Sequence, residues 1–250
     1  MTMQSFTLIG ADGKRIKGDR ADGIDRQILF ITGFLSRRWG NKSKVLAQWC
    51  RERGWGFCCY DVRGFGDSEG QFADYTLSDW IADARLVMES MRSGPPVTIT
   101  GNSLGSWIAW LVAQEFPIVN ELILIAPAFN MMGERAKTIS EERLHDWHTA
   151  GWMPWDDDPL HKDWPLSWKW VEESEHYWAR TFDVTRQVKT TILHGLQDTV
   201  IPPEGSQRFA DTLLRRDSSF PLDLRLILGD HRLSAPEQLE QFRRVVMRET

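Results

Sequence analysis

The sequence predicts an α/β protein, with one mostly parallel sheet and helices packed on both of its faces. Short apolar runs rich in β-branched residues alternate with stretches whose apolar residues recur at helical spacing. Two of these runs, residues 27–32 and 121–126, are largely apolar throughout, as strands buried on both faces are. The length of 250 residues suits one sizeable domain or two small ones, and it allows a well-buried core.

The predicted elements follow one another as strand–helix–strand units. Residues 6–18 read as an opening hairpin around Ala11-Asp12-Gly13, and Thr76 followed by Asp79 marks a helix start. Six further strands bring the sheet to eight: residues 27–32, 57–60, 96–100, 121–126, 189–194 and 222–228. The helices are expected at residues 42–53, 77–91, 104–112 and 203–214, and from Ser234 onward.

The chain is organised around Gly101-Asn102-Ser103-Leu104-Gly105, which joins the strand at 96–100 to the helix after it. A Gly-x-Ser-x-Gly sequence at a strand-to-helix bend is the pattern of a nucleophile elbow. The serine of such a tight turn holds a strained backbone, and small neighbours let the strand and the helix approach closely. An ordinary turn in a parallel sheet is the simpler alternative. The strand–turn–helix setting favours Ser103 as a nucleophile.

Two ionisable residues follow later strands, in the order acid and then histidine. Asp198 lies in the loop after the strand at 189–194, and His231 lies in the loop after the strand at 222–228. Catalytic groups of such folds gather at the carboxyl ends of the parallel strands. We therefore expect His231 to act as the base for Ser103 and Asp198 to orient the imidazole. Asp230 is the rival acid, but residues adjacent in sequence seldom face one another.

The negative oxygen of a tetrahedral intermediate needs preorganised donors. The backbone amide of Leu104 would supply one, and the amide of Phe34, after Gly33, would supply the other. We expect the substrate to contact side chains of three groups of residues. These are Phe34, Leu35 and Asn102 near the reacting centre, Trp147 and Trp152 further along the chain, and Val200 in the loop of Asp198.

Between residues 129 and 183 the alternation stops, and we expect a helical cap inserted into a single domain of residues 1–250. Its aromatic side chains would line an apolar acyl-binding cavity above Ser103. For any one tryptophan, attachment of the cap to the body is the simpler interpretation. The acidic run Asp156-Asp157-Asp158 lacks calcium-loop spacing and reads as a solvated turn. The seven tryptophans of this region are Trp147, Trp152, Trp155, Trp164, Trp168, Trp170 and Trp178.

The composition of the chain argues against several classes of function. A net charge of −5 gives no electrostatic case for nucleic acid or an anionic membrane, and no run approaches the length of a membrane span. The start lacks a basic and apolar leader, and the three cysteines fit reduced, buried thiols, so we expect a cytoplasmic protein. No cofactor is expected. The glycines at 64, 66 and 70 miss dinucleotide spacing, and His145 with His148 makes a weak case for a metal. The fifth histidine outside the expected triad, His194, reads as a packed, hydrogen-bonded strand residue.

Several stretches carry a family resemblance: Thr32-Gly33-Phe34, Asp61-x-Arg63-Gly64-x-Gly66-x-Ser68, the elbow, Asp198 and Gly229-Asp230-His231-Arg232-Leu233-Ser234. With them the chain resembles the α/β-hydrolase superfamily over nearly its whole length. It is most similar to the branch of the mitochondrial acyl-glucuronide esterase and palmitoyl-protein thioesterase, and to its bacterial relatives. Thr32, Asn102 and Ser106 depart from the residues usual in that branch. The resemblance implies a metal-free serine hydrolase of esters or thioesters, with Ser103, Asp198 and His231 as its triad.

We therefore expect hydrolysis of carboxylic esters or thioesters of small to medium acyl groups through an acyl-enzyme on Ser103. The partner would be a small-molecule substrate, and the protein would be a monomer or a homodimer. A carbon–carbon bond hydrolase or a peptidase could use the same triad. A ligand receptor or interaction scaffold without catalysis is the alternative from another class.

Overall fold

The computed structural model describes residues 2–155 and 164–249, and it confirms the α/β-hydrolase fold. One eight-stranded sheet has the order β1-β2-β4-β3-β5-β6-β9-β10, antiparallel where β2 meets β1 and β4 and parallel elsewhere. Buried strands at its centre match the apolar runs of the sequence. The strands are β1 (Gln4–Ile9), β2 (Arg15–Ala21), β3 (Gln27–Ile31), β4 (Gly56–Tyr60), β5 (Val97–Asn102), β6 (Val119–Ile125), β9 (Lys189–Gly195) and β10 (Leu222–Ile227).

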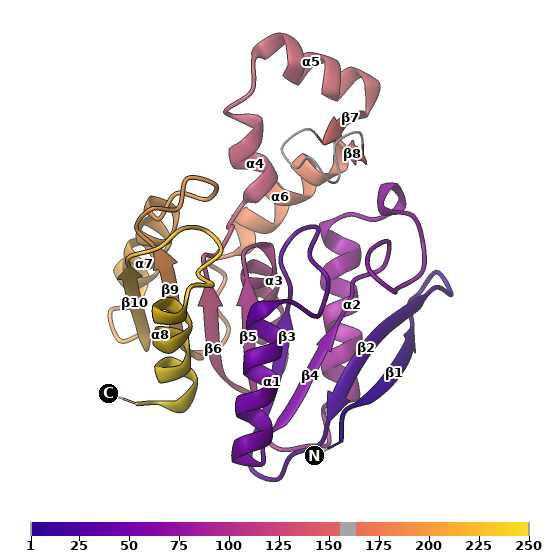
Figure 1. Ribbon diagram of the computed structural model, residues 1–250. Coiled ribbons are helices and arrows are strands. Elements are labelled where there is room, and N and C mark those ends of the chain that lie inside the picture. The colour runs from indigo at the N-terminus through magenta and orange to yellow at the C-terminus, as the bar shows by residue number, and fades with distance from the viewer. Residues whose placement is uncertain (1, 156–163, 250) are drawn as a thin grey trace.

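Helices cover both faces of this sheet (Figure 1). On one face, α1 (Asn41–Arg53) and α8 (Pro236–Met247) pack against strand residues such as Phe30 and Ile123. On the other face, α2 (Leu77–Ser90), α3 (Leu104–Ala113) and α7 (Glu204–Arg216) join the larger core. Successive strand residues enter opposite cores because side chains of a strand alternate between its faces.

The expected helix start at Thr76 is confirmed. The backbone amide of Thr76 donates to the Asp79 carboxylate at 2.9 Å, as in a capping box. Other boundaries differ from expectation by one to three residues, as at α7 and β6. Element ends fray, and the hydrogen bonds that define them depend on neighbours that the sequence does not show.

The segment between β6 and β9 stands above the carboxyl ends of the central strands (Figure 1). It holds α4 (Met131–Ala136), α5 (Glu141–Ala150) and α6 (Lys169–Arg180). It also holds an antiparallel pair, β7 (Trp152–Trp155) and β8 (Trp164–Ser167). The expected helical segment thus also contains a short strand pair that the sequence analysis does not predict. Aromatic residues suit a pleated pair, and their proline neighbours disfavour a helix.

We call this segment, residues 129–183, the cap. The acidic run Asp156-Asp157-Asp158, for which the sequence predicts a solvated turn, lies outside the described residues. Within the described part of the chain, no helix combines the length and the apolar character that crossing a bilayer requires.

Candidate active site

Ser103 occupies the bend between β5 and α3 with a strained backbone, at φ 54° and ψ −122°. Its amide donates to the Ile125 carbonyl at 2.8 Å, and its carbonyl accepts from the Ala128 amide at 3.2 Å. A Cβ added at Gly101 would collide with the Gly105 and Ser106 backbone across the bend, and one at Gly105 would collide with the Ile31 and Thr32 backbone at the end of β3. The steric reason for Gly101 is thus as the sequence predicts, whereas Gly105 makes room for β3.

The structure brings Ser103, His231 and Asp198 together from three separate loops. His231 Nε2 lies 3.1 Å from Ser103 Oγ, and His231 Nδ1 lies 2.7 Å from Asp198 Oδ2. The network assigns the tautomer: Nδ1–H donates to the carboxylate, and Nε2 accepts from the hydroxyl. An imidazole held between a hydroxyl and a buried carboxylate is the arrangement that activates a serine for attack.

Asp198 is buried and its two carboxylate oxygens accept four hydrogen bonds. Oδ1 accepts from the amides of Val200 at 3.0 Å and Ile201 at 2.8 Å. Oδ2 lies 3.1 Å from His194 Nε2 as well as close to His231. Burial alone would raise the pKa of Asp198, but the hydrogen bonds from His194, His231 and the Ile201 amide hold it well below its usual range. The carboxylate is therefore ionised at neutral pH.

His194 has a second role that the sequence did not reveal. It is the packed, hydrogen-bonded residue of β9 that the sequence indicates, with no exposed surface. Its Nδ1 lies 2.7 Å from Ser206 Oγ, and its Nε2 faces both Asp198 and the Ile201 carbonyl at 2.9 Å. Because both of these neighbours are acceptors, Nε2 carries the proton. The position of His194 at the end of a strand, four residues before Asp198, is the only signal that could have linked the two.

Asp230, the rival acid, is engaged elsewhere. Its Oδ1 accepts from the amides of Arg232 at 3.0 Å and Leu233 at 3.1 Å, which closes the turn that carries His231. Lys42 of α1 also holds this turn, because its Nζ donates to the Arg232 carbonyl. The acid that faces His231 is Asp198.

Gly33 lies directly against the bend of the elbow. A Cβ at Gly33 would stand 3.1 Å from Ser103 Cβ and 3.2 Å from Asn102 Nδ2. The next residue but one, Leu35, has a left-handed backbone at φ 50°. Within the described chain, the amides of Phe34 and Leu104 donate to no protein acceptor. Two free amides beside a serine can serve as donors to an oxyanion.

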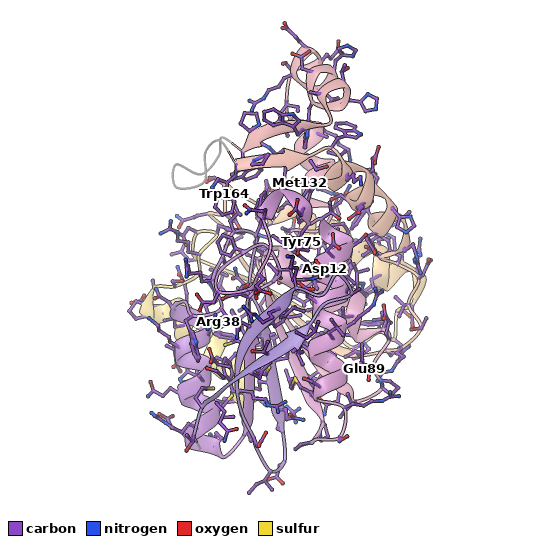
Figure 2. All side chains as sticks on the ribbon, turned by 90° about the vertical axis from the view of Figure 1, so that its right-hand side faces the viewer. Asp12, Arg38, Tyr75, Glu89, Met132 and Trp164 are labelled. Atoms are coloured by element: carbon purple, nitrogen blue, oxygen red, sulfur yellow. The ribbon has the colours of Figure 1, made fainter. Side chains whose placement is uncertain are left out.

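The loop after β3 is anchored at its far end by ion pairs. The Arg38 guanidinium binds Asp19 Oδ2 at 2.7 Å, Asp67 Oδ2 at 2.8 Å and the buried Asp61 carboxylate. Burial alone would lower the pKa of Arg38, but these carboxylates raise it. Figure 2 labels Arg38 in the body, below the cap. The anchor limits how far the Gly33–Phe34 backbone can move from Ser103.

The Phe34 ring lies within an aromatic wall shared by the body and the cap. Its centroid is 5.7 Å from Trp80 of α2, 5.2 Å from Trp155 of β7 and 5.3 Å from Trp170 of α6. Trp164 of β8 packs at 5.2 Å against Phe72, and Figure 2 labels it where the cap meets the body. The contacts of Phe34 with Trp155 and Trp170 are edge-to-face, a geometry that adds stability beyond the area it buries.

The structure places the six residues that we expect to contact the substrate in different surroundings. Phe34, Leu35 and Asn102 belong to the two loops that meet at Ser103. Val200 follows Asp198 and is 66% exposed, and its amide donates to Asp198 Oδ1 at 3.0 Å. Trp147 is buried inside the cap, where its Nε1 donates to the Leu166 carbonyl at 3.0 Å.

Trp152 is 54% exposed and lines an outer hollow of about 360 Å³ with Gly151 and Pro165. That Trp147 and Trp152 contact a substrate therefore stays a prediction. Trp155 and Trp170 are the tryptophans of the cap whose rings pack against Phe34. The sequence offers no pattern that separates one tryptophan of the cap from another.

The chain is similar to known proteins in sequence and in fold. Residues 25–153 match the family model Hydrolase_4, described as serine aminopeptidase, S33. The chain belongs to this hydrolase family. The matched residues include the elbow and end inside the cap, so Asp198 and His231 lie outside the match.

Individual relatives cover more of the chain. Mouse mitochondrial palmitoyl-protein thioesterase ABHD10 is 28% identical over 225 residues, which is 88% of this chain and 72% of the relative. The bovine protein of the same name is 23% identical over 232 residues, or 91% of this chain and 72% of the relative.

Solved structures agree on the fold. Mouse alpha/beta hydrolase domain-containing protein 10 has a TM-score of 0.86 at 24% identity, covering 97% of this chain and 96% of the other. Est1E of Butyrivibrio proteoclasticus, solved with ferulic acid bound, has a TM-score of 0.79 at 21% identity, covering 98% of each chain. Among the described residues of this Hydrolase_4 chain, no three His, Cys, Asp or Glu side chains form a group suited to a metal ion.

Proposed function

We propose that this protein is a serine hydrolase that cleaves carboxylic esters or thioesters through an acyl-enzyme on Ser103. The observation that carries the proposal is the position of His231, which lies within hydrogen-bond distance of both Ser103 Oγ and the Asp198 carboxylate. The likeness to thioesterases named ABHD10 supports the substrate class.

In the acylation step, Ser103 Oγ attacks the carbonyl carbon of the substrate while its proton passes to His231 Nε2. Asp198 stays ionised and stabilises the imidazolium through the Nδ1–H bond. The amides of Phe34 and Leu104 receive the oxyanion, and His231 then gives its proton to the departing alcohol or thiol. The acyl group remains on Ser103 Oγ.

Deacylation repeats these roles with water. His231 takes a proton from the water, which attacks the acyl carbon, and Ser103 Oγ leaves as the proton returns to it. The acid and the free serine are the products.

The aromatic wall around Phe34 supports an acyl group of small to medium size as the substrate. Trp80, Trp155 and Trp170 surround the Phe34 ring, so apolar surface lies next to the free amide that would hold the oxyanion. Apolar acyl groups gain from burial against such a wall by about 25 cal/mol per Å².

Peptide cleavage is the second candidate, because the family description names an aminopeptidase. An aminopeptidase must bind a free substrate amine, which a carboxylate near Ser103 would favour. Asp198 is the buried carboxylate at this site, and its four hydrogen bonds leave it committed to His231 and its own loop. This arrangement favours esters and thioesters.

A fluorophosphonate probe followed by an ester panel tests the proposal. We expect labelling of the wild type at Ser103, no labelling of Ser103→Ala, and undiminished labelling of Ser93→Ala, an exposed serine on the turn after α2. Nitrophenyl esters from acetate upward and acyl thioesters should turn over. A folded wild type that resists the probe and hydrolyses none of them would support a non-catalytic receptor instead.

A further inference from the structure

The open edge at β10 has its backbone set for another strand. β10 ends the sheet, and β9 is its one strand neighbour in it. The carbonyls of Pro221 and Ile227 accept from the amides of Thr190 and Leu196 on the β9 side. Alternate residues of a strand direct their backbone groups to opposite sides. The backbone groups of Leu224 and Leu226 therefore turn outward, away from β9.

The usual lysine, proline and bulge that protect an exposed edge strand are absent from β10 between Leu222 and Ile227. Its two charged residues, Asp223 and Arg225, form an ion pair with each other at 2.7 Å. In the described part of the chain, the outward groups of Leu224 and Leu226 take part in no loop or cap hydrogen bond. The strand is thus a free template for an antiparallel partner.

The sequence of β10 is complementary to itself when reversed. Around Leu224 it reads Leu222-Asp223-Leu224-Arg225-Leu226, so a two-fold axis at Leu224 sets Asp223 opposite Arg225 of a second copy. The same axis sets leucine opposite leucine at the three even positions. Cross-strand pairs of opposite charge are favourable, and like charges there are unfavourable.

The direction of the backbone groups and the positions of the charged residues favour the same pairing register for two β10 strands. With Leu224 facing its own equivalent, the outward N–H and C=O groups of Leu224 pair across the axis, and the Leu226 amide faces the Leu222 carbonyl of the second copy. The Leu222 amide itself donates to the Phe220 carbonyl at 2.8 Å. Asp223 and Arg225 then fall at non-hydrogen-bonded pairs, where side chains of neighbouring strands are closest. Within one copy, Arg225 Nε binds Asp223 Oδ2 at 2.7 Å, so both side chains already lie on one face.

Exposed apolar side chains beside the β10 edge also favour pairing with a second strand. Leu228, directly after β10, is 71% exposed, and Leu214 of α7 is exposed as well. At the opposite edge of the sheet, β1 carries no charged residue and therefore has no such register signal. Charge complementarity singles out β10.

We propose that two copies of this chain form a homodimer by antiparallel pairing of their β10 strands about Leu224. The two eight-stranded sheets become one continuous sheet. Because the strands run in opposite directions across the axis, the two Ser103 sites lie at opposite ends of it, and each stays open to substrate. This inference does not depend on the proposed hydrolase activity.

Charge reversal tests the pairing by sedimentation velocity and light scattering. The wild type should have twice the 28.9 kDa mass of one chain. Arg225→Asp places acidic residues opposite one another and should raise the dimer dissociation constant at least tenfold. The double variant Asp223→Arg/Arg225→Asp restores complementarity and should restore the dimer. Arg51→Asp, an equal charge change on exposed α1 surface, should remain a dimer.

Leu224→Pro gives an independent arm, because it removes an outward N–H that β9 does not use. We expect a monomer whose circular dichroism shows the intact fold, with a lower melting temperature because Leu224 packs against the core. A monomeric wild type would overturn the proposal. So would a dimer that survives Arg225→Asp or Leu224→Pro, or one that the double variant fails to restore while the fold is intact.

Discussion

The imidazole of His194 lies beneath the carboxylate of Asp198, with 3.1 Å between Nε2 and Oδ2. The same oxygen accepts from His231, so one carboxylate oxygen serves two imidazoles. His194 is fixed in turn by Ser206. It touches no reacting atom, and we expect it to act as a positioning residue for Asp198.

Replacement of His194 tests this role. His194→Leu removes a donor to a buried carboxylate, which should lower stability by about 1–3 kcal/mol and kcat/KM about tenfold. His194→Gln keeps an N–H donor and should recover most of both. A hydrogen bond to the ionised form lowers a pKa, so its loss raises the pKa of Asp198.

The pH profile separates positioning from mere packing. The depressed pKa of Asp198 contributes stability that is present above the usual aspartate range and is lost as pH falls through the folded-state value. In His194→Leu the acid limb of stability should therefore move to higher pH. An unmoved acid limb in a folded variant would leave His194 with a packing role alone.

The choice of acid is tested by two matched substitutions. Asp198→Asn should lower kcat on the order of 10⁴-fold, because the amide no longer favours the required tautomer of His231. Asp230→Asn should cost less than tenfold, since Asp230 serves the turn amides. Ester turnover measures both, and the reverse ranking would exchange the two assignments.

Gly33 and Gly40 lie in the same loop and provide a test and a control position for alanine substitution. Gly33→Ala puts a Cβ 3.1 Å from Ser103 Cβ, so the Phe34 amide must shift, and kcat should fall on the order of 10²-fold. Gly40→Ala meets nothing within 4 Å and should behave as wild type. Equal activities of the two variants would argue against an oxyanion role for this loop.

Two tryptophans of β7 should differ although they stand three residues apart. Trp155→Ala removes a ring from the wall around Phe34 and should change KM across a series of acyl chain lengths several-fold. Trp152→Ala alters an exposed side chain and should leave the series unchanged. A chain-length profile that responds to Trp152 rather than Trp155 would move the acyl site to the outer hollow.

Lys42 predicts a pH dependence of stability. Burial lowers its pKa to about 8, although Asp230 opposes this. Between pH 8 and the ordinary lysine pKa, the unfolded chain holds a proton on Lys42 that the folded chain has released. Lys42 therefore makes the free energy of unfolding rise with pH in this range, by at most about 3 kcal/mol. The difference in unfolding free energy between wild type and Lys42→Met should show that rise. A difference that is flat with pH would contradict the prediction.

The local sequence was sufficient for the elements and the elbow. The apolar runs, the glycines around Ser103 and the capping box at Thr76 depend on steric and hydrogen-bond rules that act within a few residues. The same rules failed for the cap, where prolines and aromatics favour the β7–β8 pair. Which aromatic side chains meet Phe34 depends on how the cap packs on the body.

By itself the sequence determined the order of strands and helices and the position of each candidate triad residue after a strand. Strand propensity, helix periodicity and the bend at Ser103 are short-range properties, so they can be read along the chain. The tertiary structure alone decided that Asp198 rather than Asp230 faces His231, that His194 supports Asp198, and that Trp155 rather than Trp152 meets Phe34. These are contacts between side chains whose directions are set by packing, and packing is a property of the whole fold.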